Sequence, residues 1–265
     1  MEKPMLLVFD IGNTQIKMGV FREKALIASW RMTTGSQKTS DEYGVDMLMM
    51  LQKDGIDPCG ISRVMISSVV PNIMHSFCSA VKAYIGQEPV LVAPGIKTGI
   101  FIKTDNPREV GADILTDAVA AYTLYGGPCT IVDFGTATKY IVVTGKGELI
   151  AAVISPGLGI SAEALVGRTA QLPSVAIKKP PTILTSNTVE CIQAGLVYGC
   201  IGQVEYIAAK IKEELGEPDM KVIATGGFGK LIAAETSCID IYDRLLTLKG
   251  LQLIAEKNTP KGTAL

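Results

Sequence analysis

The chain has 265 residues, 48% of them hydrophobic and 19% charged, which excludes an intrinsically disordered protein and allows one large domain or two lobes. A formal net charge of −1 carries no electrostatic footprint for nucleic acid or an anionic membrane. The single histidine, His75, excludes a histidine-based metal cluster and a Ser-His-Asp triad.

The sequence also indicates no export or membrane insertion. Strand-like residues begin almost at once, so no signal peptide is expected. The most apolar stretch, 149–160, is interrupted by Ser155-Pro156-Gly157 and is too short to cross a bilayer. The six cysteines contain no C-x-x-C pair, and most lie beside apolar residues, as buried thiols of a reducing compartment do. We therefore expect a soluble cytoplasmic protein.

The first half of the chain is predicted to open as a β-meander and to continue with alternating helices and strands. Apolar alternation predicts strands over residues 5–9, 15–21 and 25–30. Thr39 and Glu42 form a capping-box pattern ahead of a helix over 40–52. Further elements are predicted as a strand over 64–69, a helix over 72–85, a strand over 90–93 and a helix from Pro107 to about 124.

The second half repeats the opening pattern. The apolar run 129–132 ends in Asp133, and strands are predicted over 140–143 and 149–154. The remaining elements are predicted as helices from 161 and over 188–215, a strand over 221–224, a helix to 235 and a closing segment over 242–258. The expected fold is α/β, with duplicated mixed sheets flanked by helices. We predict lobes over 1–116 and 117–258 and a tail over 259–265.

The loop Asp10-Ile11-Gly12-Asn13-Thr14 is the first candidate site. A glycine between two strands lets backbone N–H groups face a phosphate without side-chain obstruction. Asp10 can hold a hydrated Mg²⁺ that bridges phosphate oxygens, and Lys17 can add positive charge. Taken alone, the same residues also suit an ordinary hairpin turn with a solvated aspartate.

The loop Asp133-Phe134-Gly135-Thr136-Ala137-Thr138 has the same design at the same place in the repeat. This recurrence favours a pair of loops that grip a polyphosphate from both sides of one cleft. A third apolar strand ends in Thr225-Gly226-Gly227, where glycines permit close approach of a nucleotide. Neither a Walker motif nor a dinucleotide fingerprint is present.

These three motifs, in this order, resemble the phosphate-1, phosphate-2 and adenosine motifs of the acetate kinase, sugar kinase, Hsp70 and actin superfamily. Within it the chain resembles the type III pantothenate kinases over residues 5–256. Besides the three motifs, the resemblance is carried by Ser67-Ser68-Val69-Val70-Pro71, Asp105-Asn106-Pro107, Glu109-Val110-Gly111-Ala112-Asp113, Ser155-Pro156-Gly157-Leu158 and Asn187-Thr188-Val189.

The resemblance implies an actin-like fold and ATP-dependent phosphorylation of pantothenate, the first step of coenzyme A synthesis. It implies Asp113 as the general base, Asp133 as ligand of a required potassium or ammonium ion, and a homodimer. It implies Mg²⁺ near Asp10. The implied ATP contacts are Asp10, Ile11, Gly12, Asn13, Thr14, Gln15, Ile16, Lys17 and Thr136. The implied acceptor contacts are Thr104, Gly111, Ala112, Asp113, Ile114 and Thr188.

Several positions depart from the family pattern. Ile114 stands where arginine usually follows the catalytic aspartate, and Thr104 stands where an aromatic residue usually precedes Asp-Asn-Pro. Lys139 replaces a threonine, and Ala151-Ala152 replaces a glycine pair. Two alternatives therefore stay open: a nucleotide-binding regulatory paralogue without kinase activity, and a kinase for another small hydroxyl acceptor.

Overall fold

The computed structural model describes residues 4–35, 38–169 and 171–259. It divides into two compact units. Unit 1 comprises the chain up to residue 100, residues 106–120 and the chain from residue 247, and unit 2 comprises residues 101–105 and 121–246. Most of the predicted tail, residues 260–265, lies outside the described residues.

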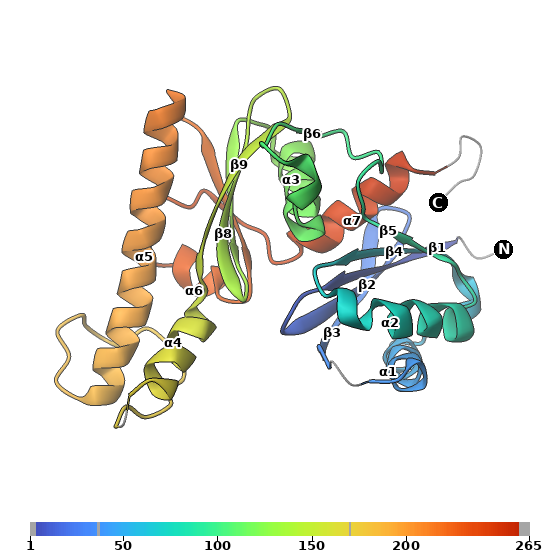
Figure 1. Cartoon of the computed structure of the whole chain (residues 1–265), viewed down its shortest axis with the longest axis horizontal. Helices are drawn as coiled ribbons and strands as arrows, with labels where there is room; N and C mark the ends of the chain where they lie inside the picture. The colour runs from blue at the N-terminus through green and yellow to red at the C-terminus, as the bar shows by residue number, and fades with distance from the viewer. Residues whose placement is uncertain (1–3, 36–37, 170, 260–265) are drawn as a thin grey trace. The chain divides into compact units, whose positions relative to one another are not determined.

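Unit 1 is built on a five-stranded mixed sheet (Figure 1). Its strand order is β3-β2-β1-β4-β5, with β1–β3 antiparallel and with β4 and β5 parallel to β1. The predicted meander is confirmed, since the consecutive strands β1, β2 and β3 pair with antiparallel neighbours. The strands are β1 (Met5–Ile11), β2 (Gln15–Arg22), β3 (Ala25–Thr33), β4 (Ile61–Ser68) and β5 (Pro89–Leu91).

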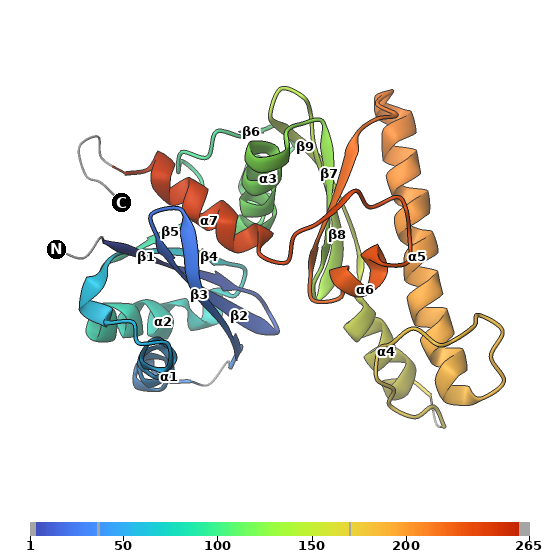
Figure 2. The ribbon, with the colours of Figure 1, turned by 180° about the vertical axis from the view of Figure 1, so that it is seen from behind.

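Helices α1 (Ser40–Lys53) and α2 (Met74–Ala80) cover one face of this sheet (Figures 1 and 2). The capping box of Thr39 and Glu42 is confirmed, with both reciprocal hydrogen bonds present. The predicted helix over 72–85 is a composite: a 3₁₀ turn (Pro71–Ile73) precedes α2 and a π turn (Val81–Ile85) ends it. A further 3₁₀ turn, Pro58–Gly60, leads into β4. Apolar side chains of α1 and α2 form one core with β1, which includes Phe9, Tyr43, Met47 and Phe77.

The opposite face of the unit 1 sheet receives α7 (Leu246–Lys257), from the far end of the sequence. A methyl group added at Gly19 of β2 would lie 3.1 Å from Leu248. Arg63 of β4 donates to the carbonyl of Ala255 at 3.1 Å. Burial lowers the pKa of the Arg63 guanidinium. Because Gly19 has no side chain, α7 can approach the sheet closely.

Helix α3 (Ala112–Tyr125) is shorter than predicted. Pro107 does occupy the first position of a helical turn, but this is the separate 3₁₀ turn Pro107–Glu109. Val110 then takes extended backbone angles, φ −66° and ψ 118°, which end the turn. The predicted helix therefore starts five residues later, at Ala112.

Unit 2 holds a six-stranded sheet in the order β11-β10-β7-β8-β9-β6 (Figure 2). Helices α4 (Leu158–Gly167), α5 (Thr188–Leu215) and α6 (Gly229–Ala233) pack on one face of it, over a core that includes Phe134, Tyr140 and Val197. The strands are β6 (Phe101–Ile102), β7 (Cys129–Phe134), β8 (Ala137–Val143), β9 (Glu148–Pro156), β10 (Lys221–Gly226) and β11 (Ile241–Tyr242). The strands β6 and β11, of two residues each, were not predicted.

The internal repeat is confirmed and extends beyond the hairpins. The strand order β9-β8-β7-β10-β11 of unit 2 matches β3-β2-β1-β4-β5 of unit 1, and β6 is an addition at one edge. In both units the fourth strand lies parallel to the first. Two mixed sheets flanked by helices agree with the expected fold class. Among the residues that the structure describes, no helix combines the length and apolar character needed to span a bilayer.

The cysteines are only partly buried as expected. All six are free, and Cys129 and Cys200 are buried. Burial raises the pKa of the Cys129 thiol to about 12 and that of Cys200 to about 11, so both stay protonated at neutral pH. The expectation of buried thiols fails for Cys59 and Cys191, which are exposed.

Candidate active site

The first Asp-x-Gly loop closes the hairpin between β1 and β2. Asp10, near the end of β1, lies directly opposite Lys17 of β2, and the Lys17 Nζ atom is 3.0 Å from an Asp10 carboxylate oxygen. Only 9% of the Asp10 side chain is exposed. The same ammonium group lies 3.5 Å from the hydroxyl of Thr247 in α7. The carboxylate is therefore held in place by a charged neighbour.

Backbone bonds fix the turn itself. The N–H of Gly12 donates to the carbonyl of Gln15 at 3.0 Å, and the hydroxyl of Thr34 donates to the carbonyl of Gly12 at 2.6 Å. Asn13 and Thr14 are exposed, whereas Ile11 and Ile16 are fully buried in the core. The two isoleucines could contact a phosphate only through their backbone.

Asp10 suits a magnesium ion that arrives with a nucleotide. Mg²⁺ keeps several waters and is usually bound by one or two carboxylates together with substrate phosphates. Among the described residues no group of three or more His, Cys, Asp or Glu side chains could hold a metal ion. A single carboxylate at the end of a strand fits the nucleotide-borne ion.

Asp113 lies close to this loop within unit 1. The N–H of Val69, just after β4, donates to the carbonyl of Ile11 at 3.1 Å. A methyl group added at Gly111 would lie 3.8 Å from Val69 and 2.6 Å from the Asp113 carboxylate. The Asp113 carboxylate also accepts a hydrogen bond from the N–H of Ile114, at 2.8 Å. A short chain of contacts thus joins the first loop to the predicted base, which sits in the first turn of α3.

The second Asp-x-Gly loop has the same construction in unit 2. Asp133 of β7 lies directly opposite Lys139 of β8, and the Lys139 Nζ atom is 2.7 Å from an Asp133 carboxylate oxygen. The side chain of Lys139 is 13% exposed and that of Asp133 is 10% exposed. Thr136, at the tip of the loop, is exposed. The position of Lys139 therefore makes it a neighbour of the predicted cation ligand.

Two glycines allow other strand ends to approach this second loop. A methyl group at Gly157, which precedes α4, would lie 2.4 Å from the Thr136 carbonyl oxygen. Gly226, with φ +89°, would place a methyl group 2.6 Å from the backbone of Phe134. The N–H groups of Gly157 and Gly227 donate to the carbonyls of Thr136 and Phe134. The predicted close approach at Gly226 is thus an approach to the loop itself.

The sequence analysis singled out no role for two buried hydroxyls beside the aspartates. Ser67 of β4 lies opposite Asp10, and Thr225 of β10 lies opposite Asp133. Both hydroxyls are fully buried and have no hydrogen-bond partner. Both residues belong to motifs that carry the family resemblance, which could have marked them. Only the strand register shows that they lie opposite the two aspartates.

The remaining predicted acceptor residues are not brought together by the contacts within either unit. Ile114 lies next to Asp113 in unit 1. Thr104 lies in unit 2 beyond β6, and its hydroxyl is buried without a hydrogen-bond partner. Thr188 is exposed at the start of α5, capped by Asn187. Thr104 and Thr188 stay predictions.

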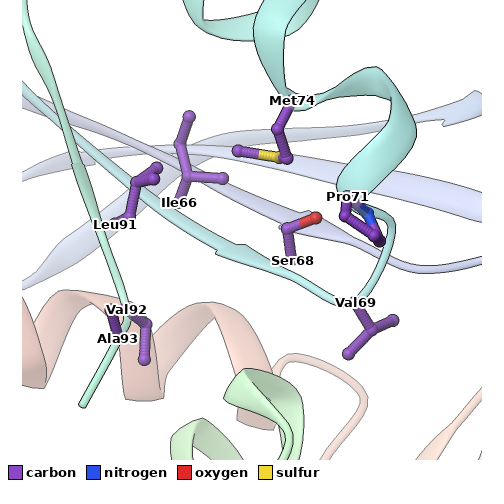
Figure 3. Close-up of a pocket in the computed structure, with 8 residues that line it drawn as sticks. All are labelled: Ile66, Ser68, Val69, Pro71, Met74, Leu91, Val92 and Ala93. Atoms are coloured by element: carbon purple, nitrogen blue, oxygen red, sulfur yellow. The ribbon is translucent and has the colours of Figure 1, made fainter.

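Unit 1 also contains a mostly apolar pocket of about 270 Å³ at the carboxyl ends of β4 and β5 (Figure 3). Its one hydroxyl, that of Ser68, accepts the N–H of Val70 at 3.1 Å. Val69, which contacts the first loop, is part of its wall. The lining residues are Ile66, Ser68, Val69, Pro71, Met74, Leu91, Val92 and Ala93, and none was predicted as a site residue.

Comparison with known proteins agrees with this geometry. The family model described as type III pantothenate kinase matches residues 6–210. A type III pantothenate kinase from Agathobacter rectalis is 49% identical over 258 residues, which cover 97% of this chain and 99% of that one. The chain belongs to the type III pantothenate kinase family. The kinase class expected from the sequence is confirmed.

Solved structures with low identity support the fold. A conserved putative Baf family transcriptional activator from Campylobacter jejuni is 17% identical with a TM-score of 0.56, covering 95% of this chain and 98% of that one. Component A of the Acidaminococcus fermentans (R)-2-hydroxyglutaryl-CoA dehydratase is 13% identical with a TM-score of 0.55, covering 97% and 100%. Together with the duplicated sheets, these likenesses confirm the actin-like fold class.

Proposed function

We propose that this protein transfers the γ-phosphoryl group of ATP to pantothenate, giving 4′-phosphopantothenate in the first step of coenzyme A synthesis. The family match, at 49% identity over nearly the whole chain, carries the proposal. Both Asp-x-Gly loops and Asp113 are present, so the parts that phosphoryl transfer needs are retained. A cytoplasmic location remains a prediction.

In this proposal the two loops bind ATP. Residues 10–17 of the first loop and Thr136 of the second loop are the proposed phosphate contacts. Asp10 holds Mg²⁺ through water, and the bound ion neutralises charge on the phosphates. Lys17 keeps the Asp10 carboxylate in position, at 3.0 Å.

Asp113 acts as the general base. Its carboxylate accepts the proton of the acceptor hydroxyl while that oxygen attacks the γ-phosphorus and the bond to ADP breaks. The N–H of Ile114 donates to one oxygen of this carboxylate at 2.8 Å and so helps to orient the base. Thr104, Gly111, Ala112, Ile114 and Thr188 are the proposed acceptor contacts.

Asp133 anchors a positive charge beside the second loop. The family pattern supplies that charge as a potassium or ammonium ion. In this chain the Lys139 ammonium group lies 2.7 Å from the same carboxylate.

A homodimer is proposed from the family pattern and from apolar surface in unit 2. Large exposed apolar patches often mark association sites. Consecutive elements of this unit, β9 and α4, expose the large apolar residues Val153, Ile154, Ile160 and Leu165. We expect a second copy of the chain to cover them.

An acceptor assay tests the function. Purified protein with ATP and Mg²⁺ should release ADP when pantothenate is added, and mass spectrometry should find phosphopantothenate. If Ile114 only weakens the hold on the acceptor, Ile114→Arg should lower the KM for pantothenate, by roughly 10–150-fold for about 1.5–3 kcal/mol of new charged hydrogen bonds. Phosphorylation of other small alcohols but not pantothenate would favour the different-acceptor alternative. ATP binding with no acceptor at all would favour the regulatory one.

A further inference from the structure

The two units share a row of three side chains across three neighbouring strands. In unit 1, Asp10 lies between Lys17 on one side and Ser67 on the other. In unit 2, Asp133 lies between Lys139 and Thr225. Directly opposite residues point to the same face of a sheet, so each row brings together an ammonium group, a carboxylate and a hydroxyl.

The lysine side chain is less exposed in unit 2 than in unit 1. The side chain of Lys139 is 13% exposed, against 24% for Lys17. Its Nζ atom lies 2.7 Å from the Asp133 carboxylate, a distance typical of a charge-assisted hydrogen bond. Strand pairing places the two Cα atoms directly opposite each other, so the ion pair lies across one position of the folded hairpin.

This arrangement does not fit a diffusible monovalent cation at Asp133. A protonated lysine has three donors and no lone pair, so it cannot ligate a cation. Its positive charge already lies 2.7 Å from the Asp133 carboxylate, so it would repel a potassium ion bound to the same carboxylate. In the pattern that the chain resembles, position 139 is a threonine, whose hydroxyl oxygen can ligate a cation.

We propose that the Lys139 ammonium group replaces the diffusible cation at Asp133. The positive charge at the second loop is then part of the chain, and phosphoryl transfer requires neither potassium nor ammonium. This inference rests on the proposed function, because it concerns the same ATP-binding loop. Lys139 is a positioning and charge-supplying residue, since it acts through Asp133.

The test compares native protein with Lys139→Thr, which restores a hydroxyl. The chloride salts of tetramethylammonium, sodium, potassium and ammonium are used at equal ionic strength. We measure kcat/KM for pantothenate and, separately, the Kd of Mg²⁺-loaded AMP-PNP, an ATP analogue that is not turned over. For native protein, both kcat/KM and the Kd of AMP-PNP should agree within about twofold in all four salts. The variant should lose about tenfold or more in tetramethylammonium and sodium and recover in potassium and ammonium.

Two further variants make the result specific. Lys139→Met keeps most of the stem but can neither supply charge nor ligate a cation well, so it should lose activity and AMP-PNP affinity in every salt. Lys146→Thr changes an exposed lysine in the turn after β8 and should behave like native protein. Circular dichroism and the melting temperature show whether each variant folds. If Lys139→Thr does not fold, Lys139→Met and the native salt series decide.

The inference is overturned if potassium raises kcat/KM of native protein tenfold or more and Lys139→Thr depends on potassium no more strongly. The analogue separates this outcome from failure of the proposed function. If no salt supports pantothenate phosphorylation, the function falls, while salt-independent AMP-PNP affinity that becomes potassium-dependent in Lys139→Thr still supports the inference. No AMP-PNP binding in any salt would overturn both.

Discussion

Asp113 is positioned in part by its immediate neighbours in the chain. The N–H of Ile114 binds one carboxylate oxygen, and Gly111 lies so close that even a methyl group there would be 2.6 Å from the carboxylate. Through Val69 this corner touches the first phosphate loop. The proposed function gives this carboxylate the role of general base.

Asp113→Asn keeps the size of the side chain and an oxygen for the N–H of Ile114, but it removes the basic group. We expect kcat for pantothenate to fall roughly 10²–10⁴-fold, the usual cost of a lost general base, with ATP affinity nearly unchanged. Steady-state kinetics and calorimetric ATP titration measure the two effects. Asp219→Asn, at an exposed turn, is the matched control and should leave both unchanged. Equal turnover by Asp113→Asn and native protein would remove the base assignment.

At the scale of single residues, sequence reasoning reached identities but not pairings. Asp10 and Asp133 were recognisable from the repeated Asp-x-Gly pattern. The ion pair of Asp133 with Lys139 depends on which residues of two strands stand opposite each other, and the orphaned hydroxyls of Ser67 and Thr225 depend on a parallel strand far along the chain. Such partners come from register, which local patterns do not contain.

Elements with a strong local signal were predicted well. The helix α5 has its predicted bounds, and α1 begins at its predicted capping box. Elements defined by distant partners were not: β6 exists through two residues that pair with β9, and α7 docks on β2 through Gly19. A two-residue strand has no period to detect, and a docking glycine looks like any other glycine in a strand.

The junction after β10 offers a matched test of the second loop. Gly226→Ala would force a side chain into φ +89° and against the Phe134 backbone, so we expect the free energy of unfolding to fall by about 2–4 kcal/mol. Gly227→Ala, one residue on, meets no atom within 4 Å and should change it by less than about 1 kcal/mol. Urea unfolding of the two variants measures the difference. Equal stabilities would mean that the close packing behind the loop is absent.

At the scale of the whole chain, the two units repeat one sheet topology and differ in the residues around it. Five strands recur in the same order, and each copy keeps an aspartate, a facing lysine and a buried hydroxyl. The first copy retains Asp113 beside its loop, whereas the second holds Thr104 and Thr188. The duplication was visible in the sequence because the hairpins are local, but the assignment of α7 to unit 1 was not, because it joins the two ends of the chain.

Transfer of labelled phosphate tests the central claim most directly. Native protein, Asp10→Asn and Asp133→Asn are each incubated with [γ-³²P]ATP, Mg²⁺ and pantothenate, and labelled phosphopantothenate is counted. We expect label in pantothenate with native protein and at least about 100-fold slower transfer with either variant, since the proposed function assigns an ATP-site role to each aspartate. Native protein that binds ATP yet labels no pantothenate, or a variant of either aspartate that transfers label at the native rate, would contradict it.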